Sequence, residues 1–333
     1  MDEMESYLAL TIDWQESLLK SEVREYPSDR LPDGEVTIRV ACSGVNYKDG
    51  LASVPNGKIV RSYPHIPGID LAGTVIASAS PRFREGDDVL VTGYGLGVTH
   101  PGGFSQLARV PADWVVPLPQ GLTAFEAMAI GTAGFTAALS VSALEANGLR
   151  RDSGPVLVAG ATGGVGSWAV ALLARSGYEV VASTRKREEI GFLKELGAAE
   201  IISPEELLLP SGKPLGSERW AAAVDPVGGA YLPSLLGTIR YGGAIALSGL
   251  TGGVSFDGSV MPFILRGVSL IGIDSVLCPM EKRLAAWERL GGEWQPGSVA
   301  ETIAHRISLA ELPGELQRIL QGQARGRAVV SLL

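Results

Sequence analysis

The sequence predicts an α/β protein with two domains, and three observations support this prediction. The chain has 333 residues, a length that favours two domains. Short strands separated by Gly and Pro fill the region from Glu5 to about Pro119, which is typical of an antiparallel barrel or sandwich. After Gly121, strands and helices alternate, and this alternation indicates a mostly parallel sheet with helices on both faces.

Composition and charge exclude several classes of protein. Hydrophobic residues make up 46% of the chain and charged residues 19%, a balance that supplies material for a core. The net charge of -8 gives no bulk support to nucleic-acid binding. Cys42 and Cys278 lie far apart, as in a reduced cytosolic protein. The start, MDEMES, lacks the basic and apolar segments of a signal peptide, and the uncharged runs 127–144 and 153–174 are rich in Gly, Ser and Thr. We therefore expect a cytoplasmic protein outside the membrane.

The first domain is predicted to consist of short strands around one polar segment. The predicted strands are VTIRVACSGV, IDLAGTVIAS, DDVLVTG and FSQLARVPADWVVPL. Between the first two lies the segment 46–68, which is interpreted as a loop. Loops on a rigid β scaffold often carry functional residues.

The second domain begins with a predicted helix, TAFEAMAIGTAGFTAALSVSALEANG, which ends at a glycine. The strands that follow are PVLVA, YEVVAST, EIIS, WAAAVD, GGAIALSGL and VSLIGIDSV, with helices REEIGFLKELG and LPSLLGTI among them. Beyond Met280 a helix, MEKRLAAWERL, precedes a strand, RAVVSLL, without βαβ spacing. We expect this tail to return to the first domain, so that the domains span 1–122 with 280–333, and 123–279.

A glycine-rich turn, GATGGVG, joins the strand PVLVA to a helix. Glycine lets the backbone turn tightly and approach a phosphate, and the helix start presents unpaired N–H groups to an anion. This context favours a nucleotide site of the Rossmann type over a buried structural turn, although the spacing departs from GxGxxG.

The residues after the next strand indicate which nucleotide binds. Enzymes specific for NAD usually place a carboxylate there, on the ribose 2′-hydroxyl. Here YEVVAST ends in Ser183, Thr184 and Arg185, and no carboxylate appears before Glu188. Hydroxyls and a guanidinium suit a 2′-phosphate. A solvated basic turn is the alternative, but its place after a glycine turn favours NADP(H).

Several stretches together resemble the medium-chain dehydrogenase/reductase superfamily, and within it the acrylyl-CoA reductase family, which is quinone oxidoreductase-like. They are GVNYKDGLA, YPHIPGIDLAGTV, PRFREGDDVLVTG, AIGTAGFTAALSV, GATGGVGSWAVALLARSGY, VDPVGG and MPFILRGVSLIGIDSV. The resemblance covers nearly the whole chain. It implies a GroES-like β-barrel catalytic domain, a Rossmann domain and a homodimer in which VSLIGIDSV extends a sheet across a two-fold axis.

The metal ligands of the zinc members of this superfamily are missing. Those members carry a cysteine soon after the first-domain GV and a GHE farther on, where this chain has Asn46-Tyr47 and Gly68-Ile69-Asp70. Zinc needs thiolate, imidazole or carboxylate ligands that converge, and the histidines and cysteines do not cluster. We expect no metal, and His65 is interpreted as a loop anchor.

The resemblance also implies the reaction and the residues of the site. Hydride passes from NADPH to the β-carbon of an α,β-unsaturated thioester or ketone, and the α-carbon is protonated. Tyr47 and the turn Thr162, Gly163, Gly164 and Val165 are implied to contact NADP(H). Ser183, Thr184 and Arg185 would hold the 2′-phosphate, Leu250, Ile264 and Ser275 the nicotinamide side, and Arg327 a phosphate or another part of the cofactor.

Tyr47 and Asn46 are the candidate catalytic residues. The Tyr47 phenol is a candidate proton donor, and Asn46 a candidate partner of the thioester oxygen, whereas Lys48 and Asp49 are interpreted as solvated loop residues. The alternative is that Tyr47 only packs on the nicotinamide and solvent protonates the α-carbon.

Three functions remain open at this point. The first is an NADPH-dependent reductase of short enoyl-CoA, for which the basic Lys58 or Arg61 would suit the phosphates of CoA. The second is an NADPH:quinone oxidoreductase. The third is a cofactor-binding protein with a structural or RNA-binding role, against which the acidic charge argues.

Overall fold

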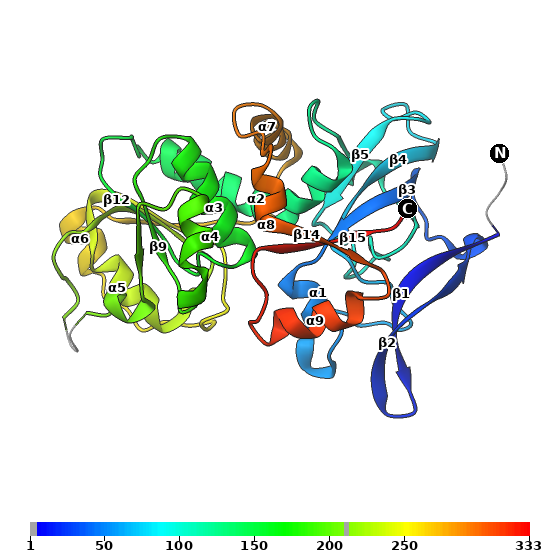
Figure 1. Cartoon of the computed structure of the whole chain (residues 1–333), viewed down its shortest axis with the longest axis horizontal. Helices are drawn as coiled ribbons and strands as arrows, with labels where there is room; N and C mark the ends of the chain where they lie inside the picture. The colour runs from blue at the N-terminus through cyan, green and yellow to red at the C-terminus, as the bar shows by residue number, and fades with distance from the viewer. Residues whose placement is uncertain (1–4, 210–212) are drawn as a thin grey trace. The chain divides into compact units, whose positions relative to one another are not determined.

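The computed structural model describes residues 5–209 and 213–333 (Figure 1). The chain forms two compact units, one of residues 1–132 and 276–333 and the other of residues 133–275. The boundaries predicted from the sequence are 122/123 and 279/280. The first boundary of the structure falls inside helix α2 (Ala124–Ala146), between Thr132 and Ala133. This is one residue beyond Gly131, whose φ of 49° and ψ of -157° interrupt the helical backbone.

The first unit is built on a seven-stranded sheet. Its order is β14-β15-β3-β4-β5-β7, and β6 also pairs with β3. The strands are β3 (Val36–Gly44), β4 (Asp70–Ser78), β5 (Asp88–Thr92), β6 (Leu107–Val110), β7 (Val116–Pro117), β14 (Ala304–Ser308) and β15 (Arg327–Ser331). The antiparallel pairing of β15 with β3 shows that the C-terminal tail returns to the first unit, as expected from the sequence.

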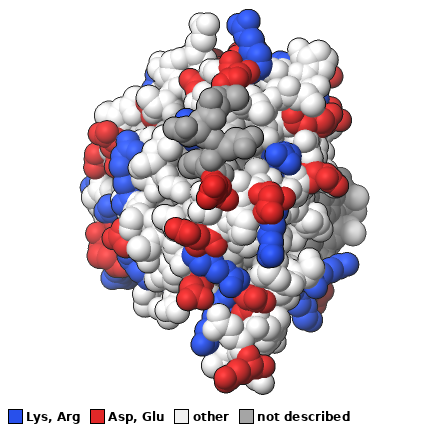
Figure 2. Space-filling view, turned by 90° about the vertical axis from the view of Figure 1, so that its right-hand side faces the viewer, with Lys and Arg blue, Asp and Glu red and all other residues white. Residues whose placement is uncertain are grey.

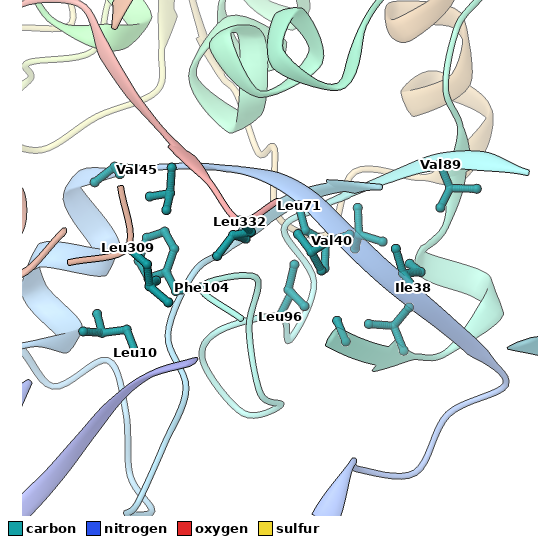
Figure 3. Packing of buried hydrophobic residues seen from close by; sticks show 14 of the residues in the cluster. Leu10, Ile38, Val40, Val45, Leu71, Val89, Leu96, Phe104, Leu309 and Leu332 are labelled. Carbon is teal, nitrogen blue, oxygen red and sulfur yellow. The ribbon is translucent and has the colours of Figure 1, made fainter. Parts of the chain in front are cut away.

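Further elements of this unit surround the sheet. A separate hairpin of β1 (Ser6–Gln15) and β2 (Leu18–Pro27) is joined to it by isolated bridges such as Ala9 with Ser105. The helices are α1 (Tyr47–Ala52), α7 (Met280–Gly291), α8 (Val299–Ile303) and α9 (Leu312–Leu320). The core consists of side chains that alternate inward along the strands, with Phe104 and Leu71 near its centre (Figure 3).

Two predictions for the first unit are wrong in detail. The stretch FSQLARVPADWVVPL forms two short strands, because the chain leaves β6 at Pro111, which lacks the N–H that a ladder needs, and makes a turn of 3-10 helix. The segment 46–68, predicted to be a loop, begins with the helix α1.

The second unit is a six-stranded parallel sheet of order β10-β9-β8-β11-β12-β13. This is the doubly wound order of a dinucleotide-binding sheet, and it confirms the predicted fold class. The elements are β8 (Val156–Val158), α3 (Gly164–Arg175), β9 (Val180–Ser183), α4 (Ile190–Glu195), β10 (Glu200–Ile202), β11 (Trp220–Asp225), α5 (Leu232–Leu236), β12 (Ile239–Leu247), α6 (Met261–Arg266) and β13 (Ser269–Gly272). Strand β13 is shorter than the predicted VSLIGIDSV.

Helix α2 is the one described helix that is long and apolar enough to cross a membrane. In the protein, 78% of its most apolar window is buried. Length and composition alone do not distinguish a spanning helix from a core helix, and this burial is typical of a core helix.

Candidate functional site

The glycine-rich turn of the second unit lies between β8 and α3. Gly160 has a left-handed φ of 55°, which favours glycine, and Gly163 is the extended N-cap residue of α3 without a side-chain cap. Gly164 and Val165 form the first helical positions. Their backbone N–H groups precede the first intrahelical hydrogen bonds, so this end of α3 presents donors to an anion.

Close packing explains Gly166 and leaves Gly163 open. A Cβ on Gly166 would lie 2.3 Å from the carbonyl oxygen of Gly160 and 2.7 Å from the Cα of Ala161, so α3 and the turn touch only because Gly166 has no side chain. A Cβ on Gly163 would meet nothing nearer than 3.4 Å. The turn therefore fits a pyrophosphate that approaches the backbone at Gly163.

The residues after β9 provide hydroxyl groups and a guanidinium at the carboxyl end of the strand. Ser183 is 1% exposed, and its Oγ has no hydrogen-bond partner within the described residues. The Thr184 Oγ1 accepts a hydrogen bond from the backbone N–H of Lys186 at 3.0 Å and lies 3.3 Å from the Thr162 Oγ1. Arg185 is exposed. The Ser183 Oγ is therefore available to a ligand, and these groups fit a 2′-phosphate.

A groove of about 450 Å³ lies at the carboxyl ends of β12 and β13 in the same unit. Its lining consists of residues 247–250 and 272–274. Leu250 is 57% exposed in this lining. Ser275 directly follows Asp274, the last lining residue in the chain. Ile264, the third residue expected on the nicotinamide side, lies on α6 outside the lining. Ligands of open parallel sheets bind at this end of the strands.

Asp225, for which no role was predicted, organises the turn after β11. It is 3% exposed, and its Oδ1 accepts hydrogen bonds from the backbone N–H groups of Val227 at 2.8 Å and Gly228 at 3.0 Å. Burial raises the pKa of this carboxyl, and the two N–H groups act in the opposite direction. Gly228 pairs with Gly253, so this turn supports the turn after β12.

In the first unit, Asn46, Asp70 and Arg327 form a buried polar cluster. The Arg327 Nη2 lies 3.1 Å from the Asp70 Oδ2, and its Nη1 donates to the Asn46 Oδ1 at 2.6 Å. The Asn46 Nδ2 donates to the same Asp70 Oδ2 at 2.7 Å, and Thr132 donates to Asp70 from both its hydroxyl and its backbone N–H. One residue from each of the two stretches in which the zinc members carry the cysteine and the GHE therefore meets here around a guanidinium.

Arg327 and Asn46 make their side-chain hydrogen bonds within the first unit. Arg327 donates five hydrogen bonds within the first unit, the others going to the carbonyl oxygens of Val45, Met128 and Ala129. The Asn46 amide donates to Asp70 and to the Gly44 carbonyl. The expected phosphate contact of Arg327 and the expected substrate contact of Asn46 therefore gain no support from the structure, and both residues position the chain that leads to Tyr47.

Tyr47 begins α1 and is 39% exposed. The helix forms because of Asp49, whose Oδ2 accepts the backbone N–H of Asn46 at 2.8 Å and whose Oδ1 accepts that of Ile69 at 3.0 Å. The interpretation of Asp49 as a solvated loop residue is wrong, because it is 1% exposed. The sequence signal was the Asn-x-x-Asp spacing of a helix start.

Electrostatics single out Asp49, which lies next to this cluster. Burial raises the pKa of its carboxyl to about 7, and the negative charge of Asp70 acts in the same direction. The two backbone N–H groups and the positive charge of Arg327 oppose the shift. A buried carboxyl that titrates near neutral pH is a feature of functional sites.

His65 is buried at 7% exposure and its backbone pairs with Ile12, as expected for a residue that anchors a loop. Burial lowers the pKa of its imidazole. Across residues 5–209 and 213–333, no group of three or more His, Cys, Asp or Glu side chains is arranged to hold a metal ion.

Comparison with known proteins gives two matching family models. Residues 32–120 match the alcohol dehydrogenase GroES-like domain, and residues 164–289 match the zinc-binding dehydrogenase domain. The acrylyl-CoA reductase AcuI of Ruegeria pomeroyi is 50% identical to this chain, over 97% of the chain and 98% of AcuI.

Two solved structures are similar over their whole length. The yhdH oxidoreductase of Salmonella enterica, in complex with NADP, is 46% identical, with a TM-score of 0.95 over 98% of this chain and 100% of the other. The Bacillus subtilis protein YhfP, solved with NAD bound and bearing a provisional quinone oxidoreductase name, is 53% identical, with a TM-score of 0.96 over 99% and 100%. The chain belongs to the medium-chain dehydrogenase/reductase superfamily, in its acrylyl-CoA reductase, quinone oxidoreductase-like family.

Proposed function

We propose that this protein is a zinc-independent, NADPH-dependent reductase that acts on the activated C=C bond of a short enoyl-CoA such as acrylyl-CoA, giving propionyl-CoA. The observation that carries the proposal is the buried cluster of Asn46, Asp70 and Arg327. Its one carboxylate is already neutralised by a guanidinium at 3.1 Å, which supports a reaction without a metal. The similarity to AcuI supports the substrate class.

The second unit supplies the binding site for NADP(H), which provides the hydride when bound. The start of α3 holds the pyrophosphate through the N–H groups of Gly164 and Val165. Ser183, Thr184 and Arg185 bind the 2′-phosphate. The groove lined by Leu250, with Ser275 directly after its last lining residue in the chain, accepts the nicotinamide side. Such a site contributes to the rate by orienting the reacting atoms.

The first unit supplies the proton and the charge stabilisation. The Tyr47 phenol is exposed at the start of a helix that Asp49 and Asn46 hold in place, so it is a positioned hydrogen-bond donor. We assign to it the stabilisation of the developing enolate and the protonation of the α-carbon. The exposed Lys58 and Arg61 follow α1 in the chain and suit the phosphates of CoA.

The substrate is tested by following NADPH absorbance with acrylyl-CoA, crotonyl-CoA and a benzoquinone in parallel. We expect oxidation of NADPH with acrylyl-CoA at a higher kcat/KM than with the quinone. The reverse order would make the protein a quinone oxidoreductase, which is the activity in the name of YhfP. No oxidation with any substrate would indicate a non-catalytic protein that binds NADPH.

The roles of Tyr47, Arg61 and zinc are tested separately. Tyr47→Phe is expected to lower kcat while the dissociation constant of NADPH stays unchanged, and an unchanged kcat would remove Tyr47 as the acid.

Arg61→Ala is expected to raise the KM for the enoyl-CoA and not the KM for a benzoquinone. Activity that survives dialysis against a chelator, with no zinc found by elemental analysis, supports the zinc-free reaction.

We also propose a cytoplasmic homodimer that uses small-molecule substrates and neither nucleic acid nor membrane. Strand β13 ends the described sheet of the second unit, and exposed apolar side chains such as Val254 and Ile264 occur in the segment before it. On the face shown in Figure 2, basic and acidic side chains are interspersed, which does not favour nucleic acid. Light scattering should give about twice the 34.8 kDa of one chain, and a monomer would contradict the dimer.

A further inference from the structure

A carboxylate lies next to the basic turn that follows β9. Strands β9 and β10 are parallel neighbours, with Ser183 opposite Ile202, and the backbone N–H of Thr184 donates to the Ile202 carbonyl at 3.1 Å. The turns 184–187 and 203–206 therefore leave the same edge of the sheet side by side. The second turn contains Glu205 and Glu206.

These two glutamates have different environments. The Glu206 Oε1 accepts the backbone N–H of Ser203 at 2.8 Å and caps the short helical turn. Glu205 is fully exposed. The pKa of its carboxyl is lowered, first by hydrogen bonds from its own backbone N–H and from Ser203. The positive charges of Arg185 and Arg187 lower it further. Glu205 is therefore ionised at neutral pH, and its charge is within electrostatic reach of the guanidinium assigned to the 2′-phosphate.

We propose that Glu205 is a specificity-determining residue of the cofactor site, whose carboxylate opposes the 2′-phosphate of NADP(H) and leaves the binding of NAD(H) unaffected. The inference rests on the proposed phosphate site at Arg185. A 2′-phosphate carries close to two negative charges, so a carboxylate on the neighbouring turn repels it through the solvent. The 2′-hydroxyl of NAD(H) is neutral and is not repelled. Glu205 thus limits the preference for the phosphorylated cofactor that Arg185 creates.

The test is a comparison of Glu205→Gln with Glu200→Gln by titration calorimetry. Glu200 is an exposed glutamate at the opposite end of β10, so its substitution removes the same charge far from the carboxyl edge of the sheet. At low ionic strength, Glu205→Gln should lower the dissociation constant of NADP⁺ about two- to fivefold, the range for exposed charge pairs. The effect should shrink at high salt. The constant for NAD⁺ should not change, and Glu200→Gln should change neither.

The inference is overturned if Glu205→Gln leaves the NADP⁺ constant equal to that of Glu200→Gln, raises it, or changes NAD⁺ equally. Arg185→Ala distinguishes this failure from that of the phosphate site. If Arg185→Ala weakens NADP⁺ binding and spares NAD⁺ while Glu205→Gln has no effect, only the role of Glu205 is wrong. If Arg185→Ala also leaves NADP⁺ binding unchanged, the phosphate site itself is wrong.

Discussion

The Arg327 guanidinium lies 3.1 Å from the Asp70 carboxylate, with side-chain exposures of 2% and 0%. Arg327 belongs to the last strand of the chain and Asp70 to β4, so the pair joins the C-terminal tail to the first half of the unit. Removing one partner of such a pair leaves an uncompensated charge in the interior, which costs far more than the pair itself contributes.

Asp70→Asn should therefore lower the free energy of unfolding by about 3–5 kcal/mol. The measurement is urea denaturation, with Asp13→Asn as the matched control. Asp13 pairs with Arg24 at 3.6 Å at the surface, where ion pairs contribute about 0–1 kcal/mol. A loss for Asp70→Asn no greater than that of the control would show that the cluster does not hold the unit together.

The stability of the first unit should depend on pH because of Asp49. The pKa of its carboxyl is about 7 in the folded protein, against the ordinary value of 3.8, because of burial and Asp70. Between these values the folded state binds the proton more tightly than the unfolded state, so the carboxyl stabilises the fold at low pH and loses this contribution as pH rises toward 7.

The free energy of unfolding of the natural protein relative to Asp49→Asn should therefore fall as pH is raised from 5 to 7.5. Urea denaturation of both proteins at several pH values gives this difference, in which the titration of other groups largely cancels. A difference that is constant, or that grows with pH, would contradict the raised pKa of Asp49.

Most elements of the fold could be predicted because their signals are local. Apolar runs between glycines and prolines located β3, and the glycine turn located the junction of β8 and α3. The helix α1 was missed because a polar capping sequence resembles a loop unless Asp49 is recognised as the acceptor of the N–H groups. Pro111 was the signal that should have divided the last predicted strand.

The candidate site could be predicted only in part. Ser183, Thr184 and Arg185 follow a strand in sequence, so their place at the end of the sheet could be inferred from their order alone. The contact of Asn46 with Arg327 joins residues 281 positions apart, and no local pattern indicates it. The resemblance identified both residues and assigned them to the cofactor and the substrate, but it does not indicate their mutual hydrogen bonds.

The two glycines of the turn should respond differently to alanine. Gly166→Ala should destabilise the second unit by about 1–3 kcal/mol, the usual cost of overpacking, because its Cβ would lie 2.3 Å from the Gly160 carbonyl. Gly163→Ala should fold normally, since its φ of -82° suits any residue and the nearest atom is 3.4 Å from the new Cβ.

Binding of NADP⁺ then shows what approaches Gly163. We expect Gly163→Ala to weaken NADP⁺ at least tenfold in calorimetry without a change in thermal stability, since the methyl group occupies the place of the pyrophosphate. If Gly163→Ala binds NADP⁺ as the natural protein does, the pyrophosphate does not contact this part of the turn.

The substitution Ser183→Ala should affect the binding of NADP⁺ and the stability of the fold differently. Its Oγ is buried without a partner in the described chain, and an unpaired buried hydroxyl costs free energy that a methyl group does not. Ser183→Ala should therefore leave the free energy of unfolding unchanged or slightly raised, and should raise the dissociation constant of NADP⁺ about five- to tenfold, the value of one hydrogen bond to a charged phosphate. Ser140→Ala is the control, because the Ser140 hydroxyl donates to the Thr136 carbonyl at 2.8 Å, so its loss should affect stability and spare binding. A Ser183→Ala protein that is less stable yet binds NADP⁺ normally would show that the Ser183 hydroxyl serves the fold rather than the cofactor.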